Sequence, residues 1–323
     1  MKILFYGFQH GHIFNLYNKV KDNKDVEIIA CVEDDEKKRA ELKETRDIVC
    51  STESLEYWLN GKGVDIVAIG DKYGKRGPAV IKALRSGCHV IADKPVCTTL
   101  KQFKEIKALS EKNNLKVACM LDLRYFSSTQ IVKKLLDEKT YGEVKNISFT
   151  GQHCIDYANR PAWYFEKGMH GGTINDLAIH GIDMLSYLTG LKVKKVHSAR
   201  CWNSYAYKTP DFLDCAMFML ELENKAGVIA DVSYSAPSQV FTMPTYWDFK
   251  IWCSTAMIHY NITSNVVTVY EEGEKGPKTV ELKVPESDYL LDLLAEIKSG
   301  DRTFTNGVLL ATEQTLKIQK ASK

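Results

Sequence analysis

Hydrophobic and polar positions alternate in blocks over the first 120 residues. Short runs rich in Val, Ile and Leu are separated by amphipathic segments, and turn-forming residues lie between them. Runs that are apolar on both faces are typical of parallel strands covered by helices on both sides. The pattern predicts a doubly wound parallel sheet, with strands over 2–6, 26–32, 47–50, 64–69, 89–92 and 115–120 and helices over 12–20, 35–45, 78–86 and 100–113. A further helix ends at Leu59, and Ser51 or Thr52 is its predicted cap.

The pattern changes after residue 121. Helices are predicted over 129–136 and 172–188, then strands over 193–203, 214–222, 227–235, 246–255, 256–270 and 278–284, then helices over 288–298 and 307–320. Runs of strands without intervening helices favour an antiparallel sheet. We therefore predict two domains: residues 1–121, an α/β domain of the Rossmann type, and residues 122–323, an α+β domain with an open, mostly antiparallel sheet.

Composition and charge exclude several classes of protein. The 323 residues carry a net charge of +2, and the basic residues are interleaved with acids, which argues against a nucleic-acid surface. No run approaches the roughly 18 apolar residues of a membrane span. The 9 cysteines are dispersed, with no zinc-type spacing, as in a reducing compartment. We expect a cytoplasmic protein that holds no metal.

The turn after the first predicted strand reads Gly7-Phe8-Gln9-His10-Gly11-His12. Dinucleotide-binding folds place the pattern G-x-G-x-x-G here, because its second glycine lets the backbone approach the pyrophosphate. In this chain Gln9 and His12 stand at the second and third glycine positions. The loop alone equally fits a turn that merely needs a glycine.

Two carboxylates, Glu33 and Asp34, end the second predicted strand. A carboxylate at this place holds the ribose 2′-hydroxyl and repels a 2′-phosphate, which favours NAD over NADP. The same acids also suit the start of a helix, and the basic residues 37–39 keep NADP open as the alternative.

Two further segments carry chemistry. Asp176, His180 and Asp183 follow two glycines at i, i+4 and i+7, a spacing that places them on one helical face. A histidine aligned with carboxylates suits proton transfer near neutral pH. Lys94 stands at the end of a predicted strand, where doubly wound sheets bind ligands. The two segments suggest one active site built from both parts of the chain. Structural roles are the alternatives: Thr173 with Asp176 also fits a capping box, Lys94 also fits an exposed lysine in a turn, and His180 also fits a histidine of the core.

These segments resemble motifs of the Gfo/Idh/MocA family of oxidoreductases. Asp93-Lys94-Pro95 is similar to the family's Glu-Lys-Pro, and residues 171–183 are similar to its Gly-Gly-x3-Asp-x3-His-x2-Asp segment. Residues 120–125 resemble the passage into the second domain, and residues 160–165 resemble a substrate-side loop.

The resemblance implies a reversible, NAD(P)-dependent oxidation of a secondary alcohol on a sugar, cyclitol or related polyol, by a homodimer or homotetramer. It implies catalytic roles for Lys94, Asp176 and His180. The implied cofactor residues are Gly7, Phe8, Gln9, His10, Gly11, His12, Glu33, Asp34, Gly70, Asp71, Asp93, Lys94 and Pro95. The implied substrate residues are Arg124, Arg160, Trp163, Tyr164, Asp176 and His180.

Two other functions fit parts of the sequence. A non-catalytic protein that senses a cofactor or a sugar would explain the altered glycine loop, but it has no need of a general base. A metal-dependent hydrolase would use His170, Asp176 and His180, but Lys94 would place a positive charge near its metal ion.

Overall fold

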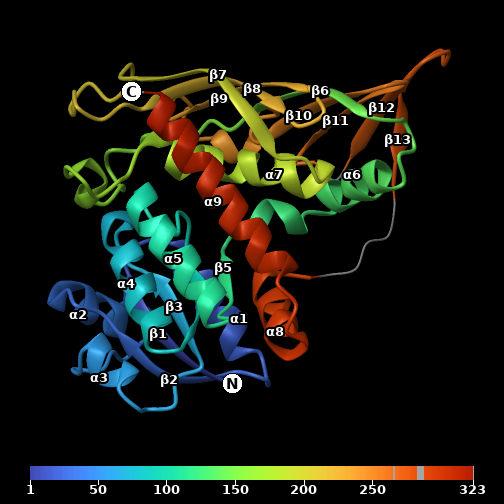
Figure 1. The fold of residues 1–323 in the computed structure, drawn as a ribbon. Coiled ribbons are helices and arrows are strands. Elements are labelled where there is room, and N and C mark those ends of the chain that lie inside the picture. The colour runs from blue at the N-terminus through green and yellow to red at the C-terminus, as the bar shows by residue number, and fades with distance from the viewer. Residues whose placement is uncertain (265, 282–286, 323) are drawn as a thin grey trace. The chain divides into compact units, whose positions relative to one another are not determined.

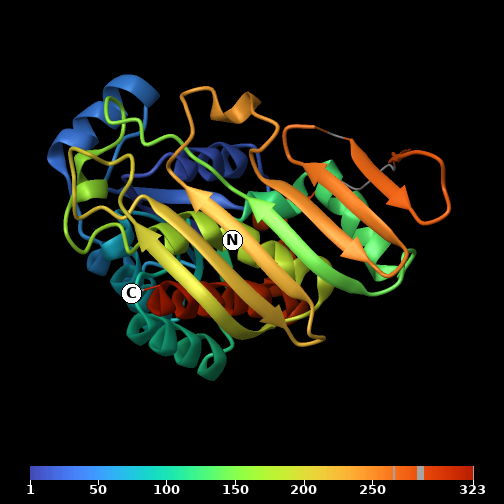
Figure 2. The same ribbon diagram turned by 90° about the horizontal axis from the view of Figure 1, so that it is seen from above.

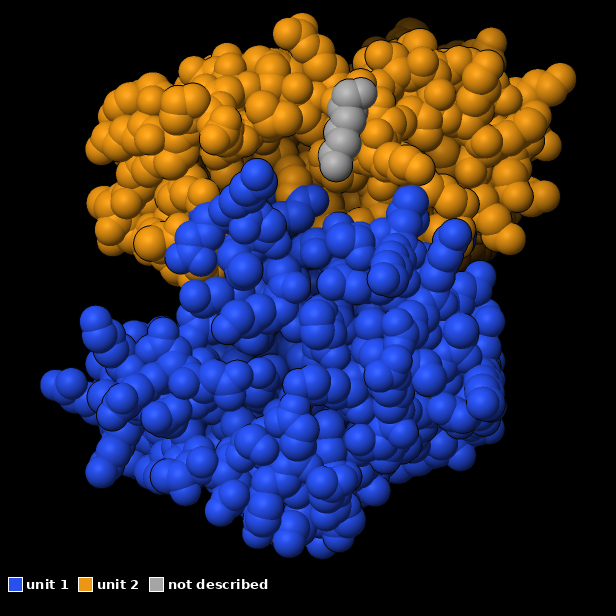
Figure 3. Space-filling model, turned by 60° about the vertical axis from the view of Figure 1, so that its left-hand side comes forward, with its two compact units in different colours: residues 1–120, 166–171, 289–312 blue, residues 121–165, 172–288, 313–323 orange. Residues whose placement is uncertain are grey.

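Two sheets organise the chain in this computed structural model, which describes residues 1–264, 266–281 and 287–322. The chain divides into two compact units (Figure 3). Unit 1 comprises residues 1–120, 166–171 and 289–312, and unit 2 comprises residues 121–165, 172–288 and 313–323. The two-range division expected from the sequence placed 166–171 and 289–312 in the second domain. The structure joins them to unit 1 because they pack on the first sheet and its helices.

The sheet of unit 1 is parallel, with strand order β2-β1-β3-β4-β5. Its strands are β1 (Lys2–Phe8), β2 (Glu27–Val32), β3 (Ile66–Gly70), β4 (His89–Ala92) and β5 (Val117–Cys119). The helices of this unit are α1 (His12–Lys21), α2 (Glu36–Arg46), α3 (Leu55–Leu59), α4 (Tyr73–Arg85), α5 (Leu100–Lys112) and α8 (Tyr289–Ser299). β3 is completely buried, as expected for a strand covered on both faces. The predicted fold class is confirmed for this half.

The sheet of unit 2 has the order β13-β12-β11-β10-β6-β9-β8-β7. Only the β6–β9 pair is parallel among the described pairs. The strands are β6 (Val144–Thr150), β7 (Val193–Trp202), β8 (Cys215–Leu222), β9 (Gly227–Ser233), β10 (Asp248–Cys253), β11 (Ala256–Asn261), β12 (Val267–Glu271) and β13 (Lys278–Val280). The predicted open, mostly antiparallel sheet is therefore confirmed.

Helices cover one face of this second sheet. α6 (Ser127–Asp137) packs on β11 and β12, and α7 (Ile179–Thr189) packs on β6 (Figure 1). Short turns η1 (Asp122–Tyr125), η2 (Ala162–Phe165), η3 (Ile174–Ala178) and η4 (Val240–Thr242) link the elements. The opposite face of this sheet is its open face, and it is turned toward the viewer in Figure 2. That face exposes apolar side chains such as Met217, Met219 and Ile229.

The two units share the last helix, α9 (Thr303–Ala321). Its residues through Thr312 belong to unit 1, and those from Glu313 belong to unit 2. None of the helices in the described part of the chain has the length and apolar character that a membrane crossing requires.

Several predicted elements differ from the structure. The strand over 47–50 is absent, because Asp47 ends α2 in the left-handed region and only an isolated bridge joins Val32 to Ser51. Ser54, rather than Ser51 or Thr52, caps α3. The predicted strand 256–270 is two strands, and β6 was missed. Of the predicted strand 278–284, residues 282–284 lie outside the described residues.

One difference in helix α4 bears on the site. The sequence predicts a helix that starts at Pro78, whereas α4 starts at Tyr73 and holds Pro78 in its interior. Proline is most common in the first turn of a helix, since it has no N–H to donate. Here the earlier turn forms nonetheless, and it carries Tyr73 and Arg76.

Candidate functional site

The turn after β1 requires glycine at its first position. Gly7 has φ +75°, and a Cβ on it would lie 2.6 Å from backbone atoms of Asp71. Gly70 has a similar role, because a Cβ there would lie 2.6 Å from Ile13. These two glycines let α1 start close to the carboxyl ends of β1 and β3.

The start of helix α1 has the properties of an anion site. Gly11 precedes the helix, and a Cβ placed on it would meet no atom within 4 Å. The first turn holds no acidic residue, and no side chain caps it. Backbone N–H groups and the helix dipole at such a terminus favour a phosphate group. This part of the loop therefore fits the diphosphate of a dinucleotide.

The two carboxylates at the end of β2 have different roles. Glu33 is buried, and it accepts hydrogen bonds from Phe8 N at 2.7 Å and Gln9 Nε2 at 3.0 Å. It therefore braces the loop, and it turns the Gln9 side chain toward itself. Asp34 is exposed and accepts a hydrogen bond from the Tyr6 hydroxyl at 2.7 Å. Of the two, Asp34 is the carboxylate that solvent and a ribose can reach.

Asp93, directly after β4, is the buried centre of a cluster of polar side chains. It accepts from His10 Nδ1 at 2.6 Å, from His12 Nδ1 at 3.1 Å and from Arg76 Nη2 at 3.2 Å. We call these four residues the Asp93 cluster. Burial raises the pKa of Asp93, but His10, Arg76 and His12 outweigh burial and hold this pKa well below its usual range. Burial lowers the pKa of His10 to about 4 against the attraction of Asp93.

Arg76 joins the ends of two strands. Its Nε donates to Asp71 O at 2.6 Å, and its Nη1 donates to Lys94 O. The guanidinium is completely buried and lies over the Tyr73 ring, 4.4 Å from the centroid. Burial also raises the pKa of the Asp71 carboxyl. Arg76 thus fixes the backbone on which Lys94 stands.

Lys94 is buried, and a cis peptide bond joins it to Pro95. Its Nζ lies 5.8 Å from the centroid of the Tyr73 ring. His170 reaches the same ring at 5.8 Å, because Gly74 N donates to Met169 O at 2.7 Å and holds this segment against α4. Tyr73 and Arg76 were not predicted as site residues, since the helix expected from the sequence starts at Pro78 and excludes both.

In unit 2, Asp176 lies in η3, a turn of π-helix that precedes α7. The hydroxyl of Tyr234 donates a hydrogen bond to its carboxylate, and both residues are 1% exposed. Burial, followed by the charge of Asp176, raises the pKa of Tyr234 well above its usual value. Tyr234 therefore stays protonated and acts as a donor to Asp176. π-helical turns inside α-helices are frequent at functional sites.

His180 stands in the first turn of α7, close to the second sheet. A Cβ on its neighbour Gly181 would lie 2.1 Å from the Phe149 ring of β6, so only glycine allows this approach. The His180 ring meets the Trp247 ring edge-on, with centroids 5.4 Å apart. His180 is thereby held in an aromatic environment and is 5% exposed.

Asp183 forms an ion pair with Arg124. Arg124 Nε donates to Oδ2 at 2.7 Å, and Nη2 donates to Oδ1 at 2.5 Å. Burial lowers the pKa of Arg124, but Asp183 more than offsets this effect, so the net shift is upward. The Arg124 side chain, predicted to contact substrate, is thus engaged inside unit 2.

The loop over 160–165 connects to Asp176 through Tyr234. Arg160 donates to Cys154 O at 2.7 Å and to Ile155 O at 2.9 Å. Its guanidinium lies over the Tyr164 ring at 4.6 Å and over the Tyr234 ring at 5.1 Å. We call Arg160, Asp176 and Tyr234 the Asp176 cluster.

Two other predicted substrate residues are core residues of this loop. Trp163 and Tyr164 are both buried, and their ring centroids lie 4.4 Å apart. This packing fits a structural role in which the two rings support the loop.

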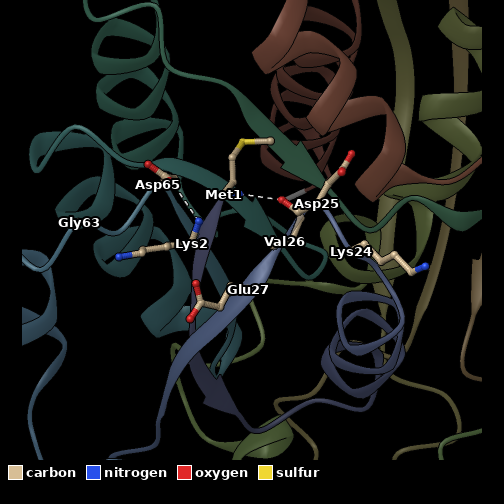
Figure 4. Close-up of a pocket in the computed structure, with 8 residues that line it drawn as sticks. All are labelled: Met1, Lys2, Lys24, Asp25, Val26, Glu27, Gly63 and Asp65. Carbon is tan, nitrogen blue, oxygen red and sulfur yellow. Dashed lines mark hydrogen bonds between the residues drawn. The ribbon is translucent and has the colours of Figure 1, made fainter.

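A hollow of about 520 Å³ lies at the opposite edge of the first sheet, at the amino ends of its strands (Figure 4). It is lined by residues of both charge signs, including Lys2, Asp25 and Asp65. Lys2 N donates to Asp65 there at 2.7 Å. We assign no ligand to this hollow, because parallel sheets bind ligands at their carboxyl ends.

Models of known protein families match both halves of the chain. Residues 1–121 match the model of an oxidoreductase family with an NAD-binding Rossmann fold. Residues 129–259 match the Gfo/Idh/MocA C-terminal domain. The chain belongs to the Gfo/Idh/MocA family. This confirms the family predicted from the sequence, and an NAD-binding Rossmann domain is characteristic of that family.

Two curated relatives are 26% and 27% identical to this chain over the matched residues. A D-xylose dehydrogenase of Paenarthrobacter nicotinovorans is 26% identical over 64% of this chain and 56% of the relative. An NAD(+)-dependent scyllo-inositol 2-dehydrogenase of Bacillus subtilis is 27% identical over 70% of this chain and 64% of the relative. For the first three curated relatives, the match spans 56%, 37% and 40% of their length.

Solved structures confirm the fold. A protein of Erwinia carotovora atroseptica superposes with a TM-score of 0.89 and 22% identity, over 100% of this chain and 99% of that protein. At this identity the likeness establishes the fold alone.

Proposed function

We propose that this protein is an NAD-dependent dehydrogenase that oxidises a secondary alcohol of a sugar, cyclitol or related polyol, or reduces the corresponding ketone. The observation that carries the proposal is the presence, in a Gfo/Idh/MocA chain, of Lys94 together with the Asp176–Tyr234 pair and His180. The names of the D-xylose and scyllo-inositol relatives support the substrate class.

The residues of unit 1 fit the cofactor. The start of α1 at Gly11 would hold the diphosphate, and the Asp34 carboxylate would accept hydrogen bonds from the ribose hydroxyls. When bound, NAD supplies the nicotinamide that takes or gives the hydride. The exposed carboxylate of Asp34 would repel a 2′-phosphate, so we favour NAD over NADP.

We assign proton transfer to His180, whose imidazole accepts the hydroxyl proton during oxidation and returns it during reduction. Lys94 donates a hydrogen bond to the reacting oxygen. Asp176, oriented by Tyr234, holds a substrate hydroxyl, and Arg160 positions Tyr234 through its contact with that ring. We do not retain Arg124 as a substrate residue, since Asp183 engages its guanidinium.

The second candidate function is a non-catalytic sensor of a cofactor or sugar. The side chains of Gln9 and His12 at glycine positions favour it. Buried, oriented acid–base groups favour the enzyme, because ligand sensing alone does not require them.

We also propose self-association through the open face of the second sheet. Met217, Met219 and Ile229 are 48%, 46% and 58% exposed there. These three side chains line a second hollow, of about 430 Å³, together with Arg200, Lys250, Asp231 and Asp248. This mixture of charges suits contact with a second copy. Sedimentation of the wild type and of the I229E variant tests this surface.

The function is tested by titrating the protein with NADH and NADPH and then measuring turnover with a panel of polyols and sugars. We expect tighter binding of NADH, and turnover that falls about 100-fold or more in H180A and K94A. H197A and K82A, which replace a histidine and a lysine outside the proposed site, are the matched controls. Binding of cofactor without turnover of any polyol would favour the sensor, and the absence of cofactor binding would refute the proposal.

Cofactor preference has its own test. D34N removes the charge of the exposed carboxylate, and we expect the ratio of NADPH to NADH affinity to rise about tenfold. An unchanged ratio would assign the discrimination to another residue.

A further inference from the structure

The last turn of α9 contacts the turn that carries Asp176. Asn175 N, in η3, donates a hydrogen bond at 3.1 Å to Oε1 of Gln319, which lies 144 positions later in the chain. Both residues belong to unit 2, and Asn175 is completely buried. The first backbone N–H groups of a helical segment need acceptors from outside that segment. Gln319 supplies such an acceptor from another helix.

A network at the end of α9 fixes which way the Gln319 amide faces. Its Nε2 donates to Ser322 Oγ at 3.2 Å and to Cys201 Sγ, on β7, at 3.6 Å. The Ser322 hydroxyl donates to Gln319 O at 2.8 Å. Burial raises the pKa of the Cys201 thiol, so this thiol keeps its proton and donates to Ser322 Oγ at 3.2 Å. A flipped amide would set its NH2 group against the N–H of Asn175, so the network selects the orientation in which Oε1 accepts.

Gly172 makes room for this contact. It has φ +103°, and a Cβ on it would overlap Oε1 and Cδ of Gln319. Gly172 O accepts a hydrogen bond from Asp176 N at 3.0 Å. The same glycine thus admits the Gln319 amide and holds the backbone of Asp176. The second glycine of the motif over 171–183 is therefore matched to a residue that no motif marks.

The contact bears on the direction of the Asp176 side chain. Asp176 follows Asn175 in the same turn, and its carboxylate accepts the hydrogen bond of the Tyr234 hydroxyl. A shift of the Asn175 peptide therefore carries the Asp176 carboxylate away from Tyr234. The end of α9 is itself held in place, because Ile318 is completely buried in the hydrophobic core of unit 2.

We propose that Gln319 is a positioning residue for Asp176. Its amide oxygen holds the Asn175 N–H, and this keeps the carboxylate of the next residue aligned with the Tyr234 hydroxyl and with a substrate hydroxyl. Gln319 acts only through the backbone of η3. The inference rests on the proposed function, because that function gives Asp176 its role toward substrate.

Two variants of Gln319 isolate the acceptor. Q319L removes the amide oxygen together with the NH2 group, whereas Q319E removes the NH2 group and keeps an oxygen for Asn175 N. The difference between the two variants therefore reports the contact with η3 rather than the contacts with Ser322 and Cys201. Q314L, the same change at another buried glutamine of α9, is the matched control for a loss of stability.

Steady-state kinetics with a polyol that the wild type turns over are the first readout. We expect Q319L to raise KM about fivefold to tenfold and to change kcat little, because the substrate hydroxyl loses a fixed acceptor while His180 still transfers the proton. Q319E and Q314L should stay within about twofold of the wild-type KM. Q319L combined with Y234F should lower kcat/KM no further than Y234F alone, because both changes release the same carboxylate.

Hydrogen exchange of the peptide that covers residues 172–178 is the second readout, and it needs no substrate. Exchange there should be faster in Q319L than in the wild type, while Q319E and Q314L should match the wild type. Thermal unfolding of each variant separates a local change in η3 from a loss of global stability. If Q319L does not fold, S322A replaces it, because it frees the Gln319 amide without removing it; KM and exchange should then change in the same direction, by less.

The outcomes distinguish the inference from the function. If the wild type turns over no polyol, the proposed function fails, and exchange decides the inference: faster exchange in Q319L supports the positioning of η3, and unchanged exchange overturns it. With an active wild type, an unchanged KM in Q319L overturns the inference and leaves the function standing. Equal losses in Q319E and Q319L also overturn it, and so do additive losses with Y234F, since Gln319 would then act by another route.

Discussion

The hydroxyl of Tyr234 donates a hydrogen bond to the carboxylate of Asp176 in the interior of unit 2. Tyr234 follows β9 and Asp176 lies in η3, so 58 residues of sequence separate the two partners. This bond fixes the orientation of a charged side chain that is 1% exposed. A buried carboxylate that loses its donor is costly to the fold and less fixed in position.

Y234F should therefore lower kcat/KM for the polyol substrate about tenfold or more. It should also move the acidic limb of the pH–rate profile upward, because Asp176 loses a donor that favours its charged form. Steady-state kinetics across pH measure both effects. D176N keeps an acceptor for Tyr234 and serves as the control for folding. An unchanged pH profile in Y234F would mean that the pair is purely structural.

Breaking the Arg124–Asp183 pair should destabilise the protein strongly. Both side chains are nearly inaccessible, at 7% and 1% exposure, and removal of one partner from a buried ion pair costs about 3–5 kcal/mol. We expect R124M and D183N to lower the denaturant concentration at which unit 2 is half unfolded, as followed by Trp fluorescence. E56Q, which breaks the exposed Lys82–Glu56 pair, should leave this midpoint unchanged.

Glycine 181 is required for packing. A Cβ there would overlap the Phe149 ring, so G181A should cost about 1–3 kcal/mol or more of stability. G11A is the matched control, because Gly11 has helical φ and open space in the Cβ direction. Thermal unfolding compares the two variants. Equal melting temperatures would show that α7 can move away from β6 without cost.

Acid should destabilise the fold through His10. Its pKa in the folded protein is about 4, below the value of about 6.5 for an imidazole in an unfolded chain. As the pH falls, the imidazole of the unfolded chain therefore takes up a proton at a higher pH than His10 does in the folded protein. Stability should be fully present above about pH 6.5 and should fall by up to about 1.4 kcal/mol per pH unit toward pH 4.

Denaturant unfolding at a series of pH values measures this dependence, and H10N should reduce the slope between pH 6.5 and 4. A slope that is the same in H10N would assign the acid sensitivity to other groups.

The elements with strong hydrophobic periodicity were predictable from sequence, and the others were not. β3 and β4 are runs of buried residues in the pattern of a parallel sheet, and both lie where predicted. β6 was missed, because Val144–Thr150 alternates apolar and polar residues only weakly after a helix. The start of α4 was misplaced because a proline usually marks the first turn of a helix.

The residues of the candidate site were likewise only partly predictable from the sequence. Lys94, Asp176 and His180 could be proposed as site residues from the sequence because short motifs carry them. Tyr73, Arg76 and His170 were not assigned to the surroundings of Lys94, since they reach this region through the fold. The Arg124–Asp183 pair joins residues 59 positions apart, and no local pattern indicates such a pair.

Unit 1 is built from three separate stretches of the chain, and this has a consequence for its synthesis. Thr305 Oγ1 accepts from Val117 N at 3.2 Å, and Lys116 Nζ donates to Gly300 O at 3.0 Å. The edge of the first sheet is therefore completed by residues that are synthesised long after β5. A nascent chain that ends near residue 121 lacks these partners, so unit 1 can reach its final form only after residues 289–312 have been synthesised.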